Sequence, residues 1–289
     1  MDDDLHGFET SEEASQYLRH AGSLKDEDLD LGETALALAL LFLPGLRVDR
    51  FRQHLRKLCE QTGEEFQSRL RMREPDTLAT RVQVLRKILY EAHGYTGDEK
   101  SYDDIQNVNL IRVIERRKGL PISLGILSIV LAEAQGWKID GLNFPGHFLV
   151  RMEEGSERII LDPFKSLREM NAAELRLLLK SIIGKEAELS HNYYDAVSRR
   201  AILIRLENNL KKRLIEAEEY GMALVVVGAI ETFAPKEYRT LFDKGILYAK
   251  LGQKSQSIEA LENYIARAPD PKDRQHAQIL LQQIKATSQ

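Results

Sequence analysis

One histidine and one aspartate in this chain lie in short motifs that could together support acyl chemistry. His147 lies in the motif Phe-Pro-Gly-His-Phe at 144–148, and Asp162 lies in Leu-Asp-Pro-Phe at 161–164. A histidine can act as a general base when a carboxylate holds its ring in one orientation and tautomer. The pair alone forms no covalent intermediate, so its chemistry depends on the nucleophile beside it.

The segment 121–135 is predicted to be a helix that starts with proline. Pro121 suits the first turn, because its missing N–H has no intrahelical partner there, and Gly136 ends the helix. The nearest hydroxyl belongs to Ser123, which lies about 200° around the helix from Pro121. We expect Ser123 to act as a first-turn cap, with a nucleophilic role as the alternative.

A β-hairpin is expected to bring His147 and Asp162 together. The Glu-Gly pair at 154–155 suits a two-residue turn, since glycine tolerates positive φ, and this turn predicts strands at 146–153 and 156–163. In that register His147 faces Asp162, and their Cβ atoms lie about 4.5–5.5 Å apart. The imidazole and the carboxylate can hydrogen-bond at this range.

Five further residues are candidates for lining a binding cleft around the pair. Asn107 and Asn109 could supply polar donors, although loop and helix-cap roles explain their positions as well. Tyr102 is a similar case. The complete set of predicted cleft residues is Tyr102, Asn107, Asn109, Pro121 and Phe144.

Helical periodicity dominates the chain before these motifs. Residues 33–43 are apolar on all sides and predict a buried helix, and residues 48–61 carry apolar residues at helical spacing. Cys59 falls on the apolar stripe of the second helix, so we expect a buried, inert thiol. The other predicted elements are a helix from Pro75 to about 93, a helix at about 109–117 and a strand at 138–143.

The C-terminal part repeats with the period of tetratricopeptide repeats, which is 34 residues. Pro235 and Pro269 are separated by this period, and Gly245 falls where the second repeat needs a small residue between two helices. Other positions of that repeat are filled by Tyr248, Gly252, Leu261 and Tyr264. Since two repeats are fewer than a free-standing array needs, we expect them to dock on the preceding domain.

Composition favours a cytoplasmic globular protein without a nucleic-acid or membrane partner. Net charge is −4, so no basic field favours nucleic acid or an anionic membrane. The acidic start Asp2–Asp4 differs from a secretory signal, and the longest apolar run, 35–43, is far below the ~20 residues of a membrane-spanning helix. The single cysteine forms no intrachain disulfide, and the seven histidines lack metal-ligand spacing, so we expect neither a metal nor a cofactor.

Taken together, the motifs at 107–124, 144–151 and 161–164 resemble those of the Sir-B-type bacterial transglutaminase-like family with C-terminal tetratricopeptide repeats. The resemblance covers about residues 33–285. It implies an α+β fold: a papain/transglutaminase-like core with a mainly helical lobe and a small antiparallel sheet, followed by an all-α repeat tail. It also implies that Pro121 occupies the position of the catalytic cysteine, and that His147 and Asp162 occupy the positions of the catalytic histidine and aspartate.

Proline at the cysteine position lacks a nucleophile, so we predict a non-catalytic, degenerate transglutaminase-like protein. Its core cleft and repeat surface would bind a peptide or protein partner in an interaction or regulatory role. The alternative is a papain-like hydrolase or acyltransferase in which the His147–Asp162 dyad activates water or Ser123. The predicted domains are an acidic N-terminal extension at 1–30, the core at 31–193 and the repeats at 194–289.

Overall fold

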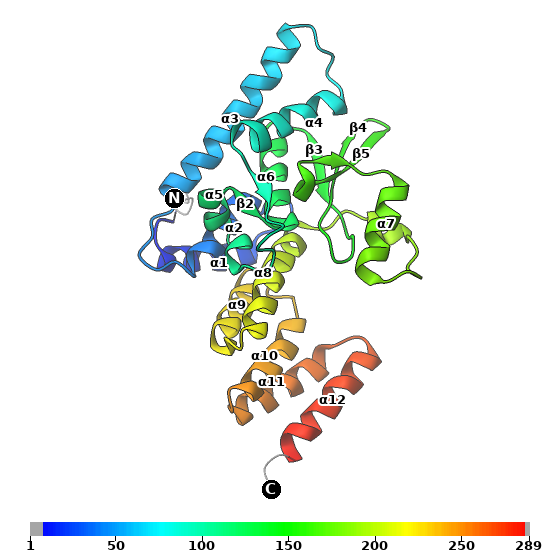
Figure 1. The fold of residues 1–289 in the computed structure, drawn as a ribbon. Helices are drawn as coiled ribbons and strands as arrows, with labels where there is room; N and C mark the ends of the chain where they lie inside the picture. Colours follow the sequence, from blue (N-terminus) through cyan, green and yellow to red (C-terminus); the bar gives the residue numbers. More distant parts are fainter. Residues whose placement is uncertain (1–7, 287–289) are drawn as a thin grey trace. The chain divides into compact units, whose positions relative to one another are not determined.

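The computed structural model describes residues 8–286, which form two compact units. The first unit contains residues 8–17 and 25–206, and the second contains residues 18–24 and 207–286. Helices α1 (Ser11–Ser23) and α8 (Arg199–Glu216) contribute residues to both units (Figure 1). The second unit therefore starts within α8, later than the repeat boundary predicted at 194. The acidic residues Asp2–Asp4 lie outside the described residues.

The helical lobe of the first unit surrounds two buried helices. α2 (Leu31–Leu40) and α6 (Pro121–Glu133) are almost entirely apolar, and nearly all of their residues are buried. A helix that is apolar on all sides must be covered on all sides, and α6 contacts α2, α3, α4 and β3. The other elements of the lobe are α3 (Asp49–Arg71), α4 (Leu78–Arg86), the π-helix η1 (Lys87–Ala92), the 3₁₀ turn η2 (Ile105–Asn107) and α5 (Leu110–Arg116).

A small antiparallel sheet completes the first unit, as predicted. Its strand order is β3-β4-β5-β6, and Figure 1 shows α6 and α7 (Ala172–Ile183) on different sides of it. A short parallel pair, β1 (Thr96–Gly97) with β2 (Lys118–Gly119), lies apart from this sheet. The four antiparallel strands are β3 (Lys138–Gly141), β4 (Val150–Glu154), β5 (Glu157–Asp162) and β6 (Arg168–Glu169).

The predicted register of the central hairpin is wrong by two residues. Val150 pairs with Leu161, and Glu154 pairs with Glu157, so the turn consists of Gly155 and Ser156. Gly155 has φ of +57° and takes the first turn position, where hairpin turns require positive φ, whereas the predicted turn has it second. A shift of two residues keeps every side chain on its predicted face, because side chains alternate with a period of two.

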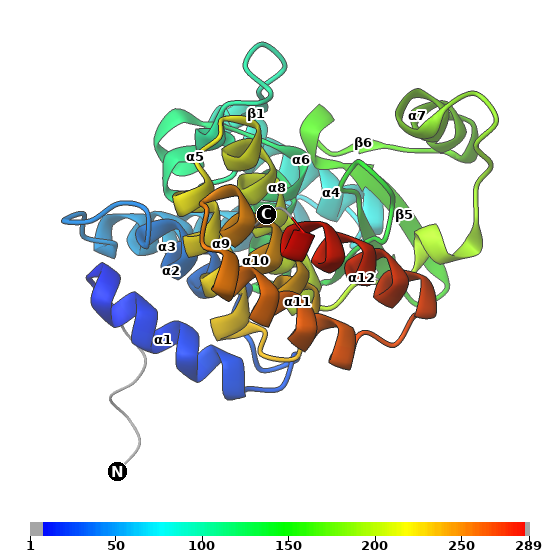
Figure 2. The same ribbon diagram turned by 90° about the horizontal axis from the view of Figure 1, so that it is seen from below.

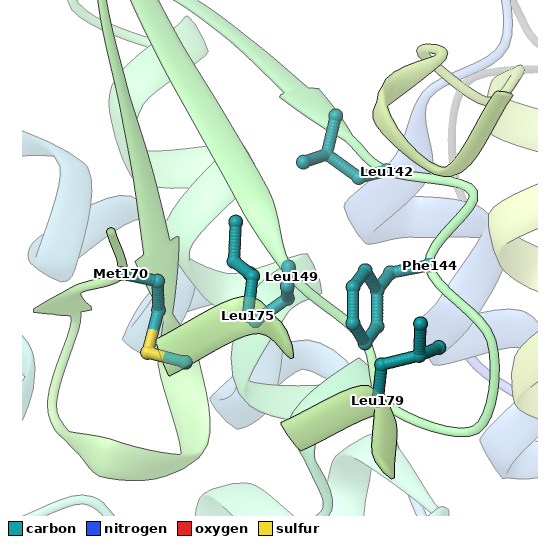
Figure 3. Close-up of a cluster of buried hydrophobic side chains, with 6 residues drawn as sticks. All are labelled: Leu142, Phe144, Leu149, Met170, Leu175 and Leu179. Carbon is teal, nitrogen blue, oxygen red and sulfur yellow. The ribbon is translucent and has the colours of Figure 1, made fainter. Parts of the chain in front are cut away.

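An apolar cluster packs along the connection between β3 and β4, where the Leu142 N–H also donates to the Leu149 backbone oxygen. Figure 3 shows the Phe144 ring among leucines from this connection and from α7. Phe144 is fully buried and contacts the Tyr193 ring edge-on, with ring centroids 6.1 Å apart. Its predicted place on a cleft wall is therefore wrong, because its ring is part of the core. The cluster consists of Leu142, Phe144, Leu149, Met170, Leu175 and Leu179.

In its described part, the second unit contains successive helices, of which those after residue 219 each pack against the next (Figure 2). They are the C-terminal part of α8, α9 (Tyr220–Phe233), α10 (Arg239–Lys250), α11 (Lys254–Arg267) and α12 (Pro271–Ala286). A Cβ atom at Gly245 would lie 2.6 Å from a methyl carbon of Leu261, which confirms the predicted close approach of α10 and α11.

Residues 18–24 also belong to the second unit, where they lie against α9. A Cβ atom at Gly22 would lie 2.3 Å from the backbone oxygen of Thr232. Glycine is therefore required for this approach, because backbone atoms cannot move aside as a side chain can. Within residues 8–286, no helix is both long and apolar enough to cross a membrane.

Candidate functional site

The structure brings His147 and Asp162 into direct contact. His147 Nε2 lies 2.9 Å from Asp162 Oδ1, so the predicted hydrogen bond is confirmed. The route differs from the prediction, since His147 lies in the irregular segment before β4 rather than in a strand. Both side chains are largely buried, with 12% and 5% of their surfaces exposed.

The Asp162 carboxylate is held in one orientation by a second donor. The backbone N–H of Phe164 donates to the same oxygen, Oδ1, at 2.9 Å, and Asp162 thereby caps the 3₁₀ turn η3 (Pro163–Lys165). A carboxylate only accepts hydrogen bonds, so Nε2 of His147 is the donor. In a neutral ring Nδ1 then carries the lone pair. Nδ1 is therefore the nitrogen with which His147 can accept a proton or a hydrogen bond.

Aromatic rings connect His147 to one of the predicted cleft residues. The Phe164 ring meets the His147 ring edge-on at 6.2 Å and the Tyr102 ring at 5.7 Å. Phe164 itself packs against Gly97, where a Cβ atom would lie 2.6 Å from its ring. The structure thus places Tyr102, which is partly exposed, in the same cluster as the dyad.

Ser123 does not fill the role that we expected. The helix α6 starts at Pro121, as predicted, and Ser123 lies fully buried in its first turn. The Ser123 hydroxyl donates to the backbone oxygen of Asn107 at 2.7 Å, so it links α6 to the preceding loop instead of capping α6. A buried hydroxyl that donates to a carbonyl is in a structural position, which disfavours Ser123 as the nucleophile.

The two predicted asparagines also have structural partners. The Asn107 side chain is fully buried, donates to the Ser101 backbone oxygen at 2.6 Å and accepts from Arg116 at 3.1 Å. Asn109 caps α5 by accepting from the backbone N–H of Arg112, and it donates to the Ala39 backbone oxygen at 2.9 Å. These contacts favour the loop and helix-cap roles over a place on the cleft wall.

A second polar cluster, which the sequence did not reveal, lies at the end of α5. His54 Nε2 lies 3.0 Å from the Tyr95 hydroxyl, and Arg117 donates to the same hydroxyl. Burial, and then the positive charge of Arg117, lower the pKa of His54 to about 4. His54 is therefore neutral at pH 7. His54, Tyr95 and Arg117 come from three separate segments, so no local pattern could have indicated the cluster.

Metal-ligating side chains do not gather in the part of the chain that the structure describes. Among residues 8–286, no group of three or more histidine, cysteine, aspartate or glutamate side chains is placed to hold a metal ion. Cys59 lies near the Val130 backbone oxygen, and burial raises the pKa of its thiol to about 11. This thiol stays protonated at neutral pH, as expected of an inert cysteine, but Cys59 is half-buried rather than fully buried.

Comparison with known families matches both parts of the chain. The profile of the transglutaminase-like superfamily matches residues 49–208, and the profile of the tetratricopeptide repeat matches residues 210–282. The first match contains the dyad, and the second contains the helices α9–α11 and most of α12.

Several bacterial proteins are similar over most of their length. A UPF0162 protein of Vibrio cholerae is 30% identical over 92% of this chain and 96% of its own length. A UPF0162 protein of Xylella fastidiosa is 29% identical over 86% of this chain and 87% of its own. Protein SirB1 of Salmonella typhimurium is 26% identical over 70% of this chain and 76% of its own. A solved structure of menin aligns at 11% identity with a TM-score of 0.39, which is too low to support a conclusion.

The family follows from three concordant observations. The superfamily profile covers more than half of the chain, the repeat profile follows it directly, and the relatives align over both parts. The histidine–aspartate pair lies within the superfamily match, with proline at the start of α6. The chain therefore belongs to the transglutaminase-like superfamily, as a SirB-type member with C-terminal tetratricopeptide repeats.

Proposed function

We propose that the dyad of the first unit belongs to a binding site for a segment of a partner protein, and that this site carries out no acyl transfer. The observation that carries the proposal is the proline at the start of α6, where the resemblance places the catalytic cysteine of the family. Pro121 has no nucleophilic atom, and the Ser123 hydroxyl donates to the Asn107 carbonyl. The dyad retains Nδ1 of His147 as a hydrogen-bonding group for a peptide.

Exposed apolar side chains next to the dyad support a protein partner. Ile182 packs on Gly146, the residue before His147, and is 40% exposed, while Tyr102 is 37% exposed and contacts Phe164. Contiguous exposed apolar side chains often mark interaction sites. Other large apolar side chains exposed on α7 and near η2 are Leu177, Ile183 and Ile105.

The repeat unit supports a second protein-binding surface. Stacked helical repeats of this type offer extended surfaces that bind peptides or helices. Net charge of −4 provides no basic field for nucleic acid, so we propose a protein or peptide partner in the cytoplasm.

A peptide-display selection tests the binding site directly. Peptides selected on the wild-type protein would be synthesised, and their Kd measured by fluorescence polarisation for wild type, His147→Ala and Ile182→Asp. We expect at least a tenfold loss of affinity in both variants. Met72→Ala is the matched control, because Met72 is a highly exposed apolar residue at the end of α3. Peptides that bind His147→Ala as tightly as wild type, or a selection that enriches none, would contradict the proposal.

The alternative function is a hydrolase in which His147 activates water. The observation that favours it is the contact of His147 Nε2 with Asp162, because Nδ1 of a neutral ring could then accept a proton from water. The test is turnover of peptide amides, esters and thioesters by wild type and His147→Ala. We expect no turnover that depends on His147, and any such turnover would replace the binding proposal with this alternative.

A further inference from the structure

The turn after Asp162 has an unusual backbone conformation. Ser166 and Leu167 have φ of 54° and 56°, so two consecutive residues with side chains adopt the left-handed region. This conformation is unfavourable for residues other than glycine and persists only where neighbouring groups enforce it. Leu167 is fully buried, so the turn cannot relax by moving that side chain into solvent.

Arg86 holds this turn from the end of α4. Its Nε donates to the Ser166 backbone oxygen and its Nη2 donates to the Leu167 backbone oxygen, both at 3.0 Å. The planar guanidinium thus binds both residues that have positive φ. A lysine has a single ammonium group and cannot reproduce this two-point geometry.

Tyr90 holds the same turn closer to the dyad. Its hydroxyl donates to the Pro163 backbone oxygen at 2.7 Å, directly after Asp162. Burial, and the nearby charge of Asp162, raise the pKa of Tyr90, so the hydroxyl keeps the proton that it donates. Arg86 and Tyr90 lie four residues apart, at the junction of α4 with the π-helix η1.

We infer that Arg86 and Tyr90 are positioning residues that fix the His147–Asp162 dyad. They connect the helical lobe to residues 163–167, while the Phe164 N–H in that segment donates to the Asp162 oxygen that binds His147. If residues 163–167 move, the Asp162 carboxylate loses its second donor and turns away from Nε2. The function of this positioning rests on the proposed binding site, but the orientation of the dyad can be measured without any partner.

The experiment compares Tyr90→Phe and Arg86→Lys with wild type. In protein labelled with ¹⁵N-histidine, the Nε2–H signal of His147 is assigned by its disappearance in His147→Gln. We expect both variants to lose this signal through faster exchange with solvent, and His147 to react at least threefold faster with diethyl pyrocarbonate. Matched controls are Tyr17→Phe, which removes a tyrosine hydroxyl near Thr34, and Arg52→Lys, which alters the guanidinium that binds Glu33. Both controls should leave His147 unchanged.

The outcomes separate positioning from stability and from the proposed function. Variants that melt at a lower temperature than wild type but keep the wild-type Nε2–H signal and reactivity of His147 would overturn the inference. If the signal is too weak in wild type, the modification rate decides alone. If the two variants change His147 while wild type binds no selected peptide, the positioning role stands and the proposed binding function fails.

Discussion

In the first unit, the buried polar side chains of Asn107, Ser123 and Asp162 all have hydrogen-bond partners. In the second unit, by contrast, the buried side chain of Glu207 has a carboxylate oxygen, Oε2, with no hydrogen-bond partner in the described chain. The helices of the second unit meet through small residues, such as Gly245 against Leu261. Buried polar side chains thus link distant segments in the first unit, and the contact of α10 with α11 in the second unit requires a small residue. Two titratable groups, Glu207 in the second unit and His54 in the first, predict that the units respond oppositely to pH.

The largest expected effect is the pH dependence of the second unit. Burial raises the pKa of Glu207 to about 8, while an unfolded glutamate titrates near 4.3. Between these values the folded state keeps a proton that the unfolded state has lost, so the free energy of unfolding falls as pH rises, in total by on the order of 5 kcal/mol. Hydrogen exchange of α8–α11 at pH 5 and pH 9 measures this loss.

Glu207→Gln is the matched variant for this prediction. An amide keeps the shape of the protonated carboxyl group but cannot ionise, so the exchange rates of α8–α11, corrected for intrinsic chemistry, should no longer depend on pH. Persistence of the dependence in Glu207→Gln would show that another group controls it.

The next largest effect concerns the close packing of α10 against α11 in the second unit. Gly245→Leu forces α10 and α11 apart, because even a Cβ atom would lie 2.6 Å from Leu261, and overpacking of this kind costs about 1–3 kcal/mol. Limited proteolysis should show new early cleavage between Glu216 and Lys254. Gly221→Leu is the control, since nothing lies within 4 Å of a Cβ atom there. An unchanged digestion pattern for Gly245→Leu would refute the role of Gly245.

A smaller effect of opposite sign is expected in the first unit. His54 has a folded pKa of about 4, below the unfolded value near 6.5. Between these values only the unfolded state binds the proton. The free energy of unfolding is therefore highest above pH 6.5 and falls as the pH decreases. After allowance for solvent screening we expect a loss of about 1–2 kcal/mol. Urea unfolding followed by Trp137 fluorescence at pH 7 and pH 5 tests this, and His54→Gln should reduce the difference.

The smallest effect concerns reactivity rather than stability. Pro121→Cys places a thiol at the N-terminus of α6, where the helix dipole lowers the pKa of a thiol. Position 121 is itself buried, but we expect the helix dipole to outweigh that burial. Burial raises the pKa of the Cys59 thiol, which has no such dipole beside it, to about 11, so the introduced thiol should be alkylated faster than Cys59. Equal, slow alkylation of both thiols would mean that the start of α6 does not retain the geometry of a cysteine site.

Sequence reasoning found the dyad because His147 and Asp162 lie in recognisable motifs, and it found Gly245 because the repeat has a period. It could not fix the hairpin register, because a shift of two residues gives the same alternation of buried side chains. It also missed the partners of Ser123, Arg86 and Tyr90, which are backbone carbonyl oxygens. Every residue carries such an oxygen, so the pattern of residue types does not indicate these contacts.

The contact of Gly22 with Thr232 affects the order in which the chain can fold during synthesis. Residues 18–24 leave the ribosome before residues 25–206, and the α9 surface that they cover is made only after both. Domains generally fold from the N-terminus as they emerge. Residues 18–24 therefore have no α9 surface to pack against while the first unit forms. A recombinant fragment that starts at Glu207 lacks the segment altogether, and production of the repeats for binding studies therefore requires the full chain or a supplied copy of residues 18–24.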